Sequence, residues 1–309
     1  MALTSFNDMM AAAERGGYAV GYFESWDLGS LLAVADAAEA THSPVILGFS
    51  GMYLSHPERL ARDHLSHYAA LGLDVCRSLS VPVCLLFNEC SNPACVLEAI
   101  ELGFHLVMFT DASLSFDEQA ARVRQISDAA HARSVAVEGE ITPLAGAGFR
   151  DVGLAGRGPM TDIGHAVRFV ADTGVDALAV DIGQVHTHGR TEVRLDFGRL
   201  DKLHAALPVP LVLHGATSVA PADLAEAPRR GIRKINVGSV LKRVYFEALC
   251  SACGKVPSDY NPYEVVGSGL SIDVLTAARV ALRHKVESLM GLFGGAGKAG
   301  PNGSGKERL

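Results

Sequence analysis

The chain has 309 residues, of which 49% are hydrophobic and 20% charged, so it can bury a large core as two ordinary domains or as one α/β barrel. Its formal net charge of −7 argues against general binding to nucleic acids or anionic membranes, because both attract basic surfaces. The six cysteines lie at irregular positions and form no disulfide framework, which favours a reducing cytoplasm. No run of about eighteen uninterrupted apolar residues predicts a membrane span.

Eight short apolar runs rich in β-forming residues follow an N-terminal stretch that has the pattern of a capped amphipathic helix. The runs are continuous rather than alternating, as expected of strands that are buried on both faces. They cover residues 17–24, 43–50, 81–88, 104–111, 134–141, 176–183, 210–217 and 232–239.

Helical segments separate most of these runs, with apolar residues spaced three and four apart. The segments cover residues 28–40, 93–102, 116–131, 162–173 and 197–206. This alternation predicts a (β/α)8 TIM barrel, whereas a doubly wound sheet is less favoured because no G-x-G-x-x-G follows the first strand.

Three further segments complete the organisation of the chain. Residues 142–159 are rich in glycine and predict a mobile loop after strand five. Residues 271–293 predict a long amphipathic helix that either covers the barrel or pairs with a second subunit. We therefore expect one barrel domain with an extra C-terminal helix over residues 1–299 and a flexible glycine-rich tail over residues 300–309.

Two histidines stand directly after predicted strands, His186 after DALAVDIGQV and His214 after PLVL. The carboxyl ends of parallel strands form the rim where α/β enzymes carry their chemistry. Two neutral imidazoles at this rim are a natural start for a metal site. The pair Asn88 and Glu89, at the end of an earlier strand, is placed to complete it.

The chain resembles the class II, metal-dependent fructose-bisphosphate and tagatose-bisphosphate aldolases from about residue 17 to residue 299. The motifs that carry the resemblance are GYAVGYFE, SPVILGFS, VPVCLLFNECS, VEGE, TGVDALAVDIG, LDFGRLDKL, PLVLHG, GIRKINVGS and FGGAGKA. The resemblance implies a (β/α)8 barrel, a divalent metal, a phosphorylated ketose as substrate and a homodimer or homotetramer.

The resemblance also implies roles for individual residues. His186 and His214 match two metal-binding histidines of the family, and Glu140 matches a glutamate that can approach the metal. The residues that match the substrate and phosphate contacts are Ser50, Arg190, Gly215, Ala216, Thr217, Asn236, Gly238 and Ser239. Backbone N–H groups after His214 and at the end of the last strand would then hold the phosphate.

The chain departs from the family pattern at the centre of the site. Asn88 and Glu89 stand where the family has an Asp-His pair, and Asn88 can neither donate nor accept a proton at neutral pH. Glu24 stands where an asparagine is expected, and the loop after strand five has no carboxylate at residues 145–150. Glu24, Glu89 and Glu140 therefore join the two histidines at one barrel mouth.

This mixture of ligands predicts a divalent ion held by His186, His214, Glu89 and Glu140. The ion is zinc or a harder ion such as Mn²⁺, Co²⁺, Mg²⁺ or Fe²⁺, since carboxylates favour harder ions. A glutamate that does not bind the metal is a candidate base. The alternative is a decayed site that binds no metal, in which Glu89 only forms a salt bridge.

We expect an aldolase-type lyase that acts on a phosphorylated ketose through an enediolate. Its candidate catalytic residues are Asn88, Glu89, Glu140 and Glu24. Two alternatives remain open. One is a sugar epimerase or isomerase that uses the same chemistry without carbon–carbon cleavage, and the other is a non-catalytic phosphosugar-binding barrel.

Overall fold

A computed structural model of the protein describes residues 3–141, 159–185 and 192–300. Eight parallel strands close into a barrel in the order β1-β2-β3-β4-β5-β6-β7-β8. The strands are β1 (Val20–Phe23), β2 (Val45–Ser50), β3 (Val83–Cys90), β4 (Leu106–Phe109), β5 (Ala136–Glu140), β6 (Ala177–Ala179), β7 (Leu211–Leu213) and β8 (Ile232–Val237). The structure thus confirms the predicted single-domain (β/α)8 barrel.

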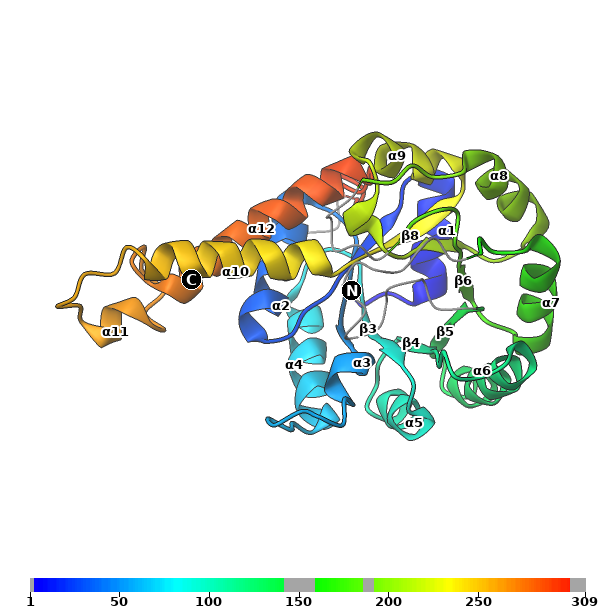
Figure 1. The fold of residues 1–309 in the computed structure, drawn as a ribbon, viewed down its shortest axis with the longest axis horizontal. Coiled ribbons are helices and arrows are strands. Elements are labelled where there is room, and N and C mark those ends of the chain that lie inside the picture. The colour runs from blue at the N-terminus through cyan, green and yellow to red at the C-terminus, as the bar shows by residue number, and fades with distance from the viewer. Residues whose placement is uncertain (1–2, 142–158, 186–191, 301–309) are drawn as a thin grey trace.

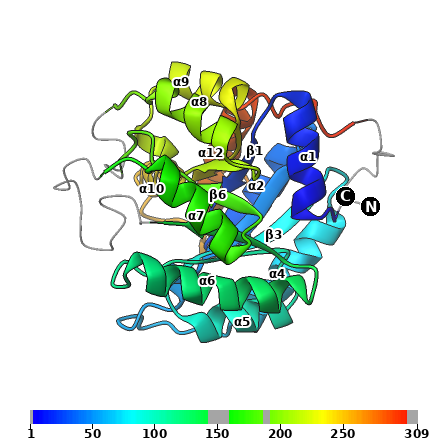
Figure 2. The ribbon, with the colours of Figure 1, turned by 90° about the vertical axis from the view of Figure 1, so that its right-hand side faces the viewer.

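The helices surround the barrel, and Figure 2 shows α5, α6, α7 and α8 following one another around its outside. They are α1 (Phe6–Gly16), α2 (Leu28–Thr41), α3 (Gly51–Leu54), α4 (Leu65–Ser78), α5 (Pro93–Glu101), α6 (Phe116–His131), α7 (Ile163–Thr173), α8 (Phe197–Ala206), α9 (Pro221–Glu226), α10 (Ser239–Cys253), α11 (Pro262–Val265) and α12 (Val274–Leu292). Short 3-10 turns cover Ala216–Ser218 and Ala227–Arg230.

Several predicted strand ends were wrong by a few residues. The run 210–217 is a strand only over Leu211–Leu213, because Gly215 adopts a left-handed conformation with φ of 66° and turns the chain into the 3-10 turn Ala216–Ser218. Likewise β6 stops well before Gly183, whose φ is 110°. In contrast, β3 continues beyond Asn88 to Cys90, with an irregular register against β4.

Helix α1 closes the amino-terminal end of the barrel. Helix α1 places Phe6, Met9 and Met10 against the inward-facing residues of the strands, among them Val20 and Ile46. Ser5 caps this helix by accepting a hydrogen bond from the N–H of Asp8. The polar side chains of the strand ends are therefore confined to the opposite, carboxyl end of the barrel.

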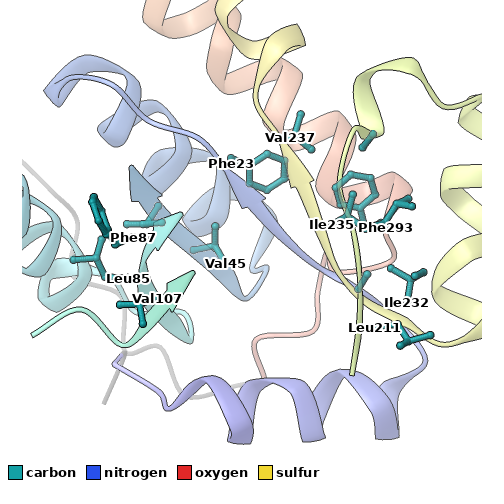
Figure 3. Packing of buried hydrophobic residues seen from close by; sticks show 14 of the residues in the cluster. Phe23, Val45, Leu85, Phe87, Val107, Leu211, Ile232, Ile235, Val237 and Phe293 are labelled. Atoms are coloured by element: carbon teal, nitrogen blue, oxygen red, sulfur yellow. The ribbon is translucent and has the colours of Figure 1, made fainter. Parts of the chain in front are cut away.

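Helices α10, α11 and α12 form an arm that projects away from the barrel (Figure 1). Helix α12 packs along α10 in the arm and along α2 on the barrel. Just after its end, the ring of Phe293 lies nearly parallel to that of Phe23 with centroids 6.2 Å apart. Figure 3 shows the two rings near each other in the core. The N–H of Ala19 also donates to the carbonyl of Phe293. The predicted extra helix therefore covers the barrel wall beside β1.

Two expectations concern segments that the structure does not describe in full, so they remain untested. The mobile loop predicted after strand five and the tail residues 301–309 lie outside the described residues. The division into a domain at 1–299 and a tail at 300–309 stays a prediction. Among the described helices, none is long and apolar enough to cross a membrane.

Candidate active site

The predicted site residues of β3, β5 and β8 meet at the carboxyl end of the barrel. β3 contributes Asn88 and Glu89, while β5 contributes Glu140 at its last position. His214 follows β7, and Asn236 lies near the end of β8. Parallel strands bring such residues together because all their carboxyl ends open on the same rim.

His214 is the centre of this arrangement and is almost fully buried, with 2% of its surface exposed. Its Nδ1 lies 3.0 Å from Oε1 of Glu89, and its Nε2 lies 2.7 Å from Oε1 of Glu138. Nδ2 of Asn236 lies 2.9 Å from the same Nε2. Burial disfavours the charged imidazole, but the hydrogen bonds to Glu138 and Glu89 outweigh it and raise the pKa of His214.

Below His214, Lys234 and Glu138 form an ion pair inside the barrel, and neither side chain is exposed. Nζ of Lys234 lies 2.7 Å from Oε2 of Glu138 and donates to Oδ1 of Asn236 at 2.5 Å. Burial alone would raise the pKa of Glu138, yet Lys234 and the hydrogen bond from His214 lower it. Glu138 is therefore a permanent carboxylate beneath the site.

Glu140 is the second carboxylate of β5, two residues further along the strand. It is 5% exposed and accepts a hydrogen bond from Oγ1 of Thr110, at 3.1 Å. Burial raises the pKa of Glu140 to about 8, although nearby His214 opposes the rise. A buried carboxyl group that titrates near neutral pH is suited to exchange a proton with a substrate.

Glu89 reaches His214 from an unusual backbone conformation. Its φ is 49°, in the left-handed region that non-glycine residues seldom adopt. The register of β3 against β4 shifts between Phe87 and Cys90, so a bulge re-aims the backbone at this position. The bulge directs the carboxylate of Glu89 toward the mouth, where its side chain is 20% exposed.

Glu24 occupies the rim after β1, where it forms an ion pair with Lys242 of α10. Burial is the main cause that raises the pKa of Glu24, and Lys242 opposes it. Nζ of Lys242 also lies 3.8 Å from the centroid of the Tyr53 ring. The structure therefore places Glu24 at the same mouth as Glu89, as predicted, with a cation and an aromatic ring beside it.

The two loops expected to hold phosphate are adjacent. The N–H of Val240 donates to Oγ1 of Thr217 at 3.3 Å, which joins the segment after β7 to the start of α10. A Cβ at Gly238 would lie 2.6 Å from Oε2 of Glu24, so a larger residue here would displace the Glu24 carboxylate. Gly215, Ala216 and Ser239 belong to the same two segments.

Ser50 and Asn88 are neighbours in the β2–β3 register and form the wall of the mouth on that side. Both are buried, and Oγ of Ser50 has no hydrogen-bond partner within the described part of the chain. Oδ1 of Asn88 lies 3.5 Å from Nδ2 of Asn236. An unpaired buried hydroxyl beside the site is suited to a polar atom of a substrate.

His186 and Arg190 lie outside the described residues, as does the loop segment 145–150. Their predicted roles as metal ligand and phosphate contact remain predictions. Within the described ranges, no group of three His, Cys, Asp or Glu side chains is arranged to hold a metal ion.

The donor set nevertheless fits a divalent ion. The 3.0 Å between Nδ1 of His214 and Oε1 of Glu89 suits two ligand atoms that share one ion at about 2.1 Å each. Several carboxylates also converge on this mouth, and Glu89 and Glu138 add to the rise that burial causes in the pKa of Glu140. A metal ion would supply the missing positive charge.

Sequence reasoning missed Lys234 and Glu138. Both lie within predicted strands, and each stands two residues before a predicted site residue, Asn236 and Glu140 respectively. Residues two apart on a strand share a face. This spacing was the signal that could have placed both side chains beneath the site.

Comparison with known proteins agrees with this architecture. The YdjI aldolase from Escherichia coli K12 superposes with a TM-score of 0.77 and 25% sequence identity, covering 96% of this chain and 99% of that one. A putative fructose-1,6-biphosphate aldolase from Coccidioides immitis superposes with a TM-score of 0.79 at 24% identity, over 94% and 96% of the two chains. The second likeness shows the shared fold.

Relatives with similar sequences are aldolases as well. A fructose-bisphosphate aldolase of Geobacillus stearothermophilus is 32% identical over 305 residues, which cover 97% of this chain and 99% of the relative. A 6-phospho-5-dehydro-2-deoxy-D-gluconate aldolase of Bacillus licheniformis is 31% identical over 304 residues, 97% of each chain. A sulfofructosephosphate aldolase of Alkalicoccus urumqiensis is 29% identical over 300 residues, covering 97% and 99%.

The family described as Fructose-bisphosphate aldolase class-II matches residues 4–298, nearly the whole chain. Members of this family generally depend on a divalent metal ion. The expected aldolase-type lyase is thereby confirmed, and the epimerase and the non-catalytic barrel are not favoured. The chain belongs to the class II fructose-bisphosphate aldolase family.

Proposed function

We propose that this enzyme cleaves a phosphorylated ketose by a metal-dependent retro-aldol reaction in which glutamates do the work of the family's Asp-His pair. The observation that carries the proposal is the convergence of Glu89, His214 and Glu140 at one barrel mouth. The names of the relatives support the substrate class, since each names a phosphorylated sugar or sugar acid.

His214 and Glu89 would hold the ion together with His186, and Glu140 lies close enough to His214 to approach it. Carboxylate ligands favour Mn²⁺, Co²⁺, Mg²⁺ or Fe²⁺ beside Zn²⁺. When bound, the ion supplies a Lewis acid for the carbonyl oxygen of the ketose.

The phosphate group would bind at the backbone N–H groups of Gly215, Ala216 and Thr217 and at Gly238 and Ser239. Anions are stabilised there because helix α10 begins at Ser239, and the first N–H groups of a helix carry partial positive charge. Further contacts to the sugar come from Ser50, Asn236 and Arg190.

Proton transfer falls to Glu140. Its carboxylate accepts the proton of the hydroxyl on the far side of the breaking carbon–carbon bond. That carbon becomes the aldehyde, and the bonding electrons move toward the ketose carbonyl, giving an enediolate that then takes a proton on carbon from the protonated Glu140. Asn88 holds the hydroxyl oxygen by a hydrogen bond, since an amide cannot exchange the proton itself. Glu24 is held by Lys242 and orients the far end of the substrate.

The enzyme assembles in the cytoplasm as a homodimer or homotetramer through the arm of α10, α11 and α12. More than half of the exposed large hydrophobic side chains of the described residues lie on this arm. They are Phe246, Tyr260, Tyr263, Val266, Leu270, Ile272, Leu275 and Val280. A standard interface buries about 800 Å² of surface on each partner. The exposed halves of these side chains, which have surfaces of up to about 200 Å² each, can together provide that area.

A hollow on the same arm favours a second copy of the chain as the partner. It has a volume of about 400 Å³, lies between α10 and α12, and is lined by residues such as Ala252, Val256 and Ile272. Tyr263 projects from the arm with 87% of its surface exposed. In a two-fold dimer each arm can insert one aromatic side chain and receive one, because such interfaces are self-complementary.

The reaction is tested with metal-free protein to which Mn²⁺, Co²⁺ or Zn²⁺ is returned. We expect a higher melting temperature with at least one ion, and release of a triose phosphate from one of a panel of ketose phosphates, trapped by a coupled dehydrogenase. The reaction is run in deuterated water, so that a new isomer formed without triose would reveal an epimerase and overturn the proposal. Glu140→Gln should bind the ion and lose turnover, whereas exposed Glu98→Gln should behave as the wild type.

A further inference from the structure

The ion pair of Lys234 and Glu138 is the most deeply buried charged group beside the site. Both side chains have no exposed surface, and Nζ of Lys234 also lies 5.2 Å from the centre of the Tyr22 ring. Removing two charges from water is costly, and well-packed apolar side chains of similar size often stabilise a fold as well as a buried pair does. Stability alone therefore does not account for this pair.

The geometry connects the pair to His214. Glu138 uses Oε2 for Lys234, at 2.7 Å, and Oε1 for Nε2 of His214, also at 2.7 Å. Lys234 thereby fixes the carboxylate in the orientation that meets the imidazole. A carboxylate that accepts the N–H of a histidine sets the ring orientation and leaves the lone pair on the other nitrogen.

The neighbours of Nε2 support this proton position. The amide nitrogen of Asn236 lies 2.9 Å away, but it is a donor and Lys234 holds its amide by binding Oδ1. Of the two contacts, the one to Glu138 is shorter and charged, so Nε2 carries a proton and donates it to Glu138. Nδ1 faces Oε1 of Glu89, on the side where the ion is expected, and it also carries a proton when no ion is bound.

We propose that Glu138 and Lys234 are positioning residues that hold the ring of His214 with Nε2–H donating to Glu138 and Nδ1 pointing into the mouth of the barrel. The role in metal binding rests on the proposed function, whereas the orientation of the ring does not require a metal. Neither residue touches the substrate. Lys234 acts on the site twice, through Glu138 and through Asn236.

The test separates positioning from a merely structural role. Lys234→Met alone leaves the Glu138 carboxylate buried without its cation, so we expect a strongly destabilised protein. The double variant Lys234→Met, Glu138→Leu removes both charges and should regain most of the stability against urea. If the pair only stabilises the fold, the double variant should behave like the wild type. If the pair positions His214, the double variant should fold but differ in the two readouts below.

Two readouts are made on the double variant. The first is the proton–nitrogen NMR spectrum of metal-free protein labelled with ¹⁵N in histidine, with His214 assigned by loss of its signals in His214→Asn. We expect a slowly exchanging Nε2–H signal in the wild type, because Glu138 accepts this proton inside the barrel, and its loss in the double variant. The second is Mn²⁺ or Co²⁺ affinity by equilibrium dialysis, which should fall by about 10- to 100-fold.

The control is Arg133→Met, which removes an exposed ion pair with Glu101 on the outside of the barrel and should change neither readout. A folded double variant with the wild-type Nε2–H signal and wild-type metal affinity would overturn the proposal. If the wild-type protein binds no ion, the proposed metal-dependent function is refuted, but the positioning role is not. In that case the Nε2–H signal of His214 decides alone: its loss in the double variant supports the positioning role, and its retention refutes it.

Discussion

Glu89 contacts Nδ1 of His214 at 3.0 Å from a left-handed backbone conformation with φ of 49°. A residue with a Cβ is strained in this region by about 1–2 kcal/mol, whereas glycine is not. Strained residues of this kind concentrate at functional sites, where the surrounding structure holds them. The contact and the strain can be separated by substitution.

We expect both Glu89→Ala and Glu89→Gly to lose affinity for the divalent ion by at least about tenfold, because each removes a carboxylate ligand. Glu89→Gly should be more stable than Glu89→Ala by about 1 kcal/mol, since glycine relieves the strain. Equilibrium dialysis and urea unfolding measure the two effects. Metal binding that both variants retain would show that Glu89 is no ligand.

The pH dependence of stability should reveal Glu140. Because the folded state raises its pKa from 4.5 to about 8, the folded protein binds this proton more tightly than the unfolded chain does. The free energy of unfolding of the metal-free protein should therefore fall as pH rises from about 4.5 to about 8. In Glu140→Gln this fall should become shallower.

Three other groups contribute to the same profile and remain in the variant. Glu24 also has a raised pKa, and the raised pKa of His214 adds a loss of stability that begins above 6.5. Burial lowers the pKa of His105, which adds a gain of stability as pH rises toward 6.5. The comparison is therefore between slopes, measured by urea unfolding at intervals from pH 5 to pH 8. Identical slopes in the wild type and Glu140→Gln would contradict the assignment.

The stacked rings of Phe23 and Phe293 attach the last helix to the first strand, and each is at most 1% exposed. Phe293→Ala should destabilise the protein by about 3–5 kcal/mol, through lost burial and the cavity left behind. Thermal and urea unfolding measure this cost. Leu97→Ala, on the exposed side of α5, is the control and should lie within about 0.5 kcal/mol of the wild type.

The arm should determine the oligomeric state. Phe246→Asp combined with Tyr263→Asp places charges among exposed apolar side chains, so we expect dissociation toward monomers with little loss of fold. Light scattering coupled to size-exclusion chromatography measures the mass. Leu60→Asp, at a fully exposed position away from the arm, should leave the assembly intact. An unchanged mass in the double variant would show that the subunit interface does not lie on the arm.

The sequence predicted the barrel because continuous apolar runs and helical segments alternate along it. It also placed Glu140 and His214 correctly at strand ends, where the change from apolar to polar residues is visible. The ends themselves were less predictable. A single left-handed glycine, Gly215, turned predicted strand residues into a 3-10 turn.

The contacts inside the site could not be predicted in the same way. Lys234 and Glu138 stand in strands that read as core, and only the closed barrel shows that they face each other from β8 and β5. The pairing of Glu89 with His214 depends on a bulge in β3 that has no clear signature in the letters FNEC. Such contacts arise from closure of the sheet rather than from local pattern.

Helix α12 lies in the arm at one end and against the barrel wall at the other. Its buried residues Leu282 and Val286 belong to the main hydrophobic core, and Phe293 follows directly after it. A minimal barrel therefore cannot be made by truncating the chain before the arm, because β1 would lose its cover. The segment between Cys253 and Val274, at the tip of the arm and wholly within the described residues, makes no such contact with β1, so a change of length there would leave the base of the arm in place.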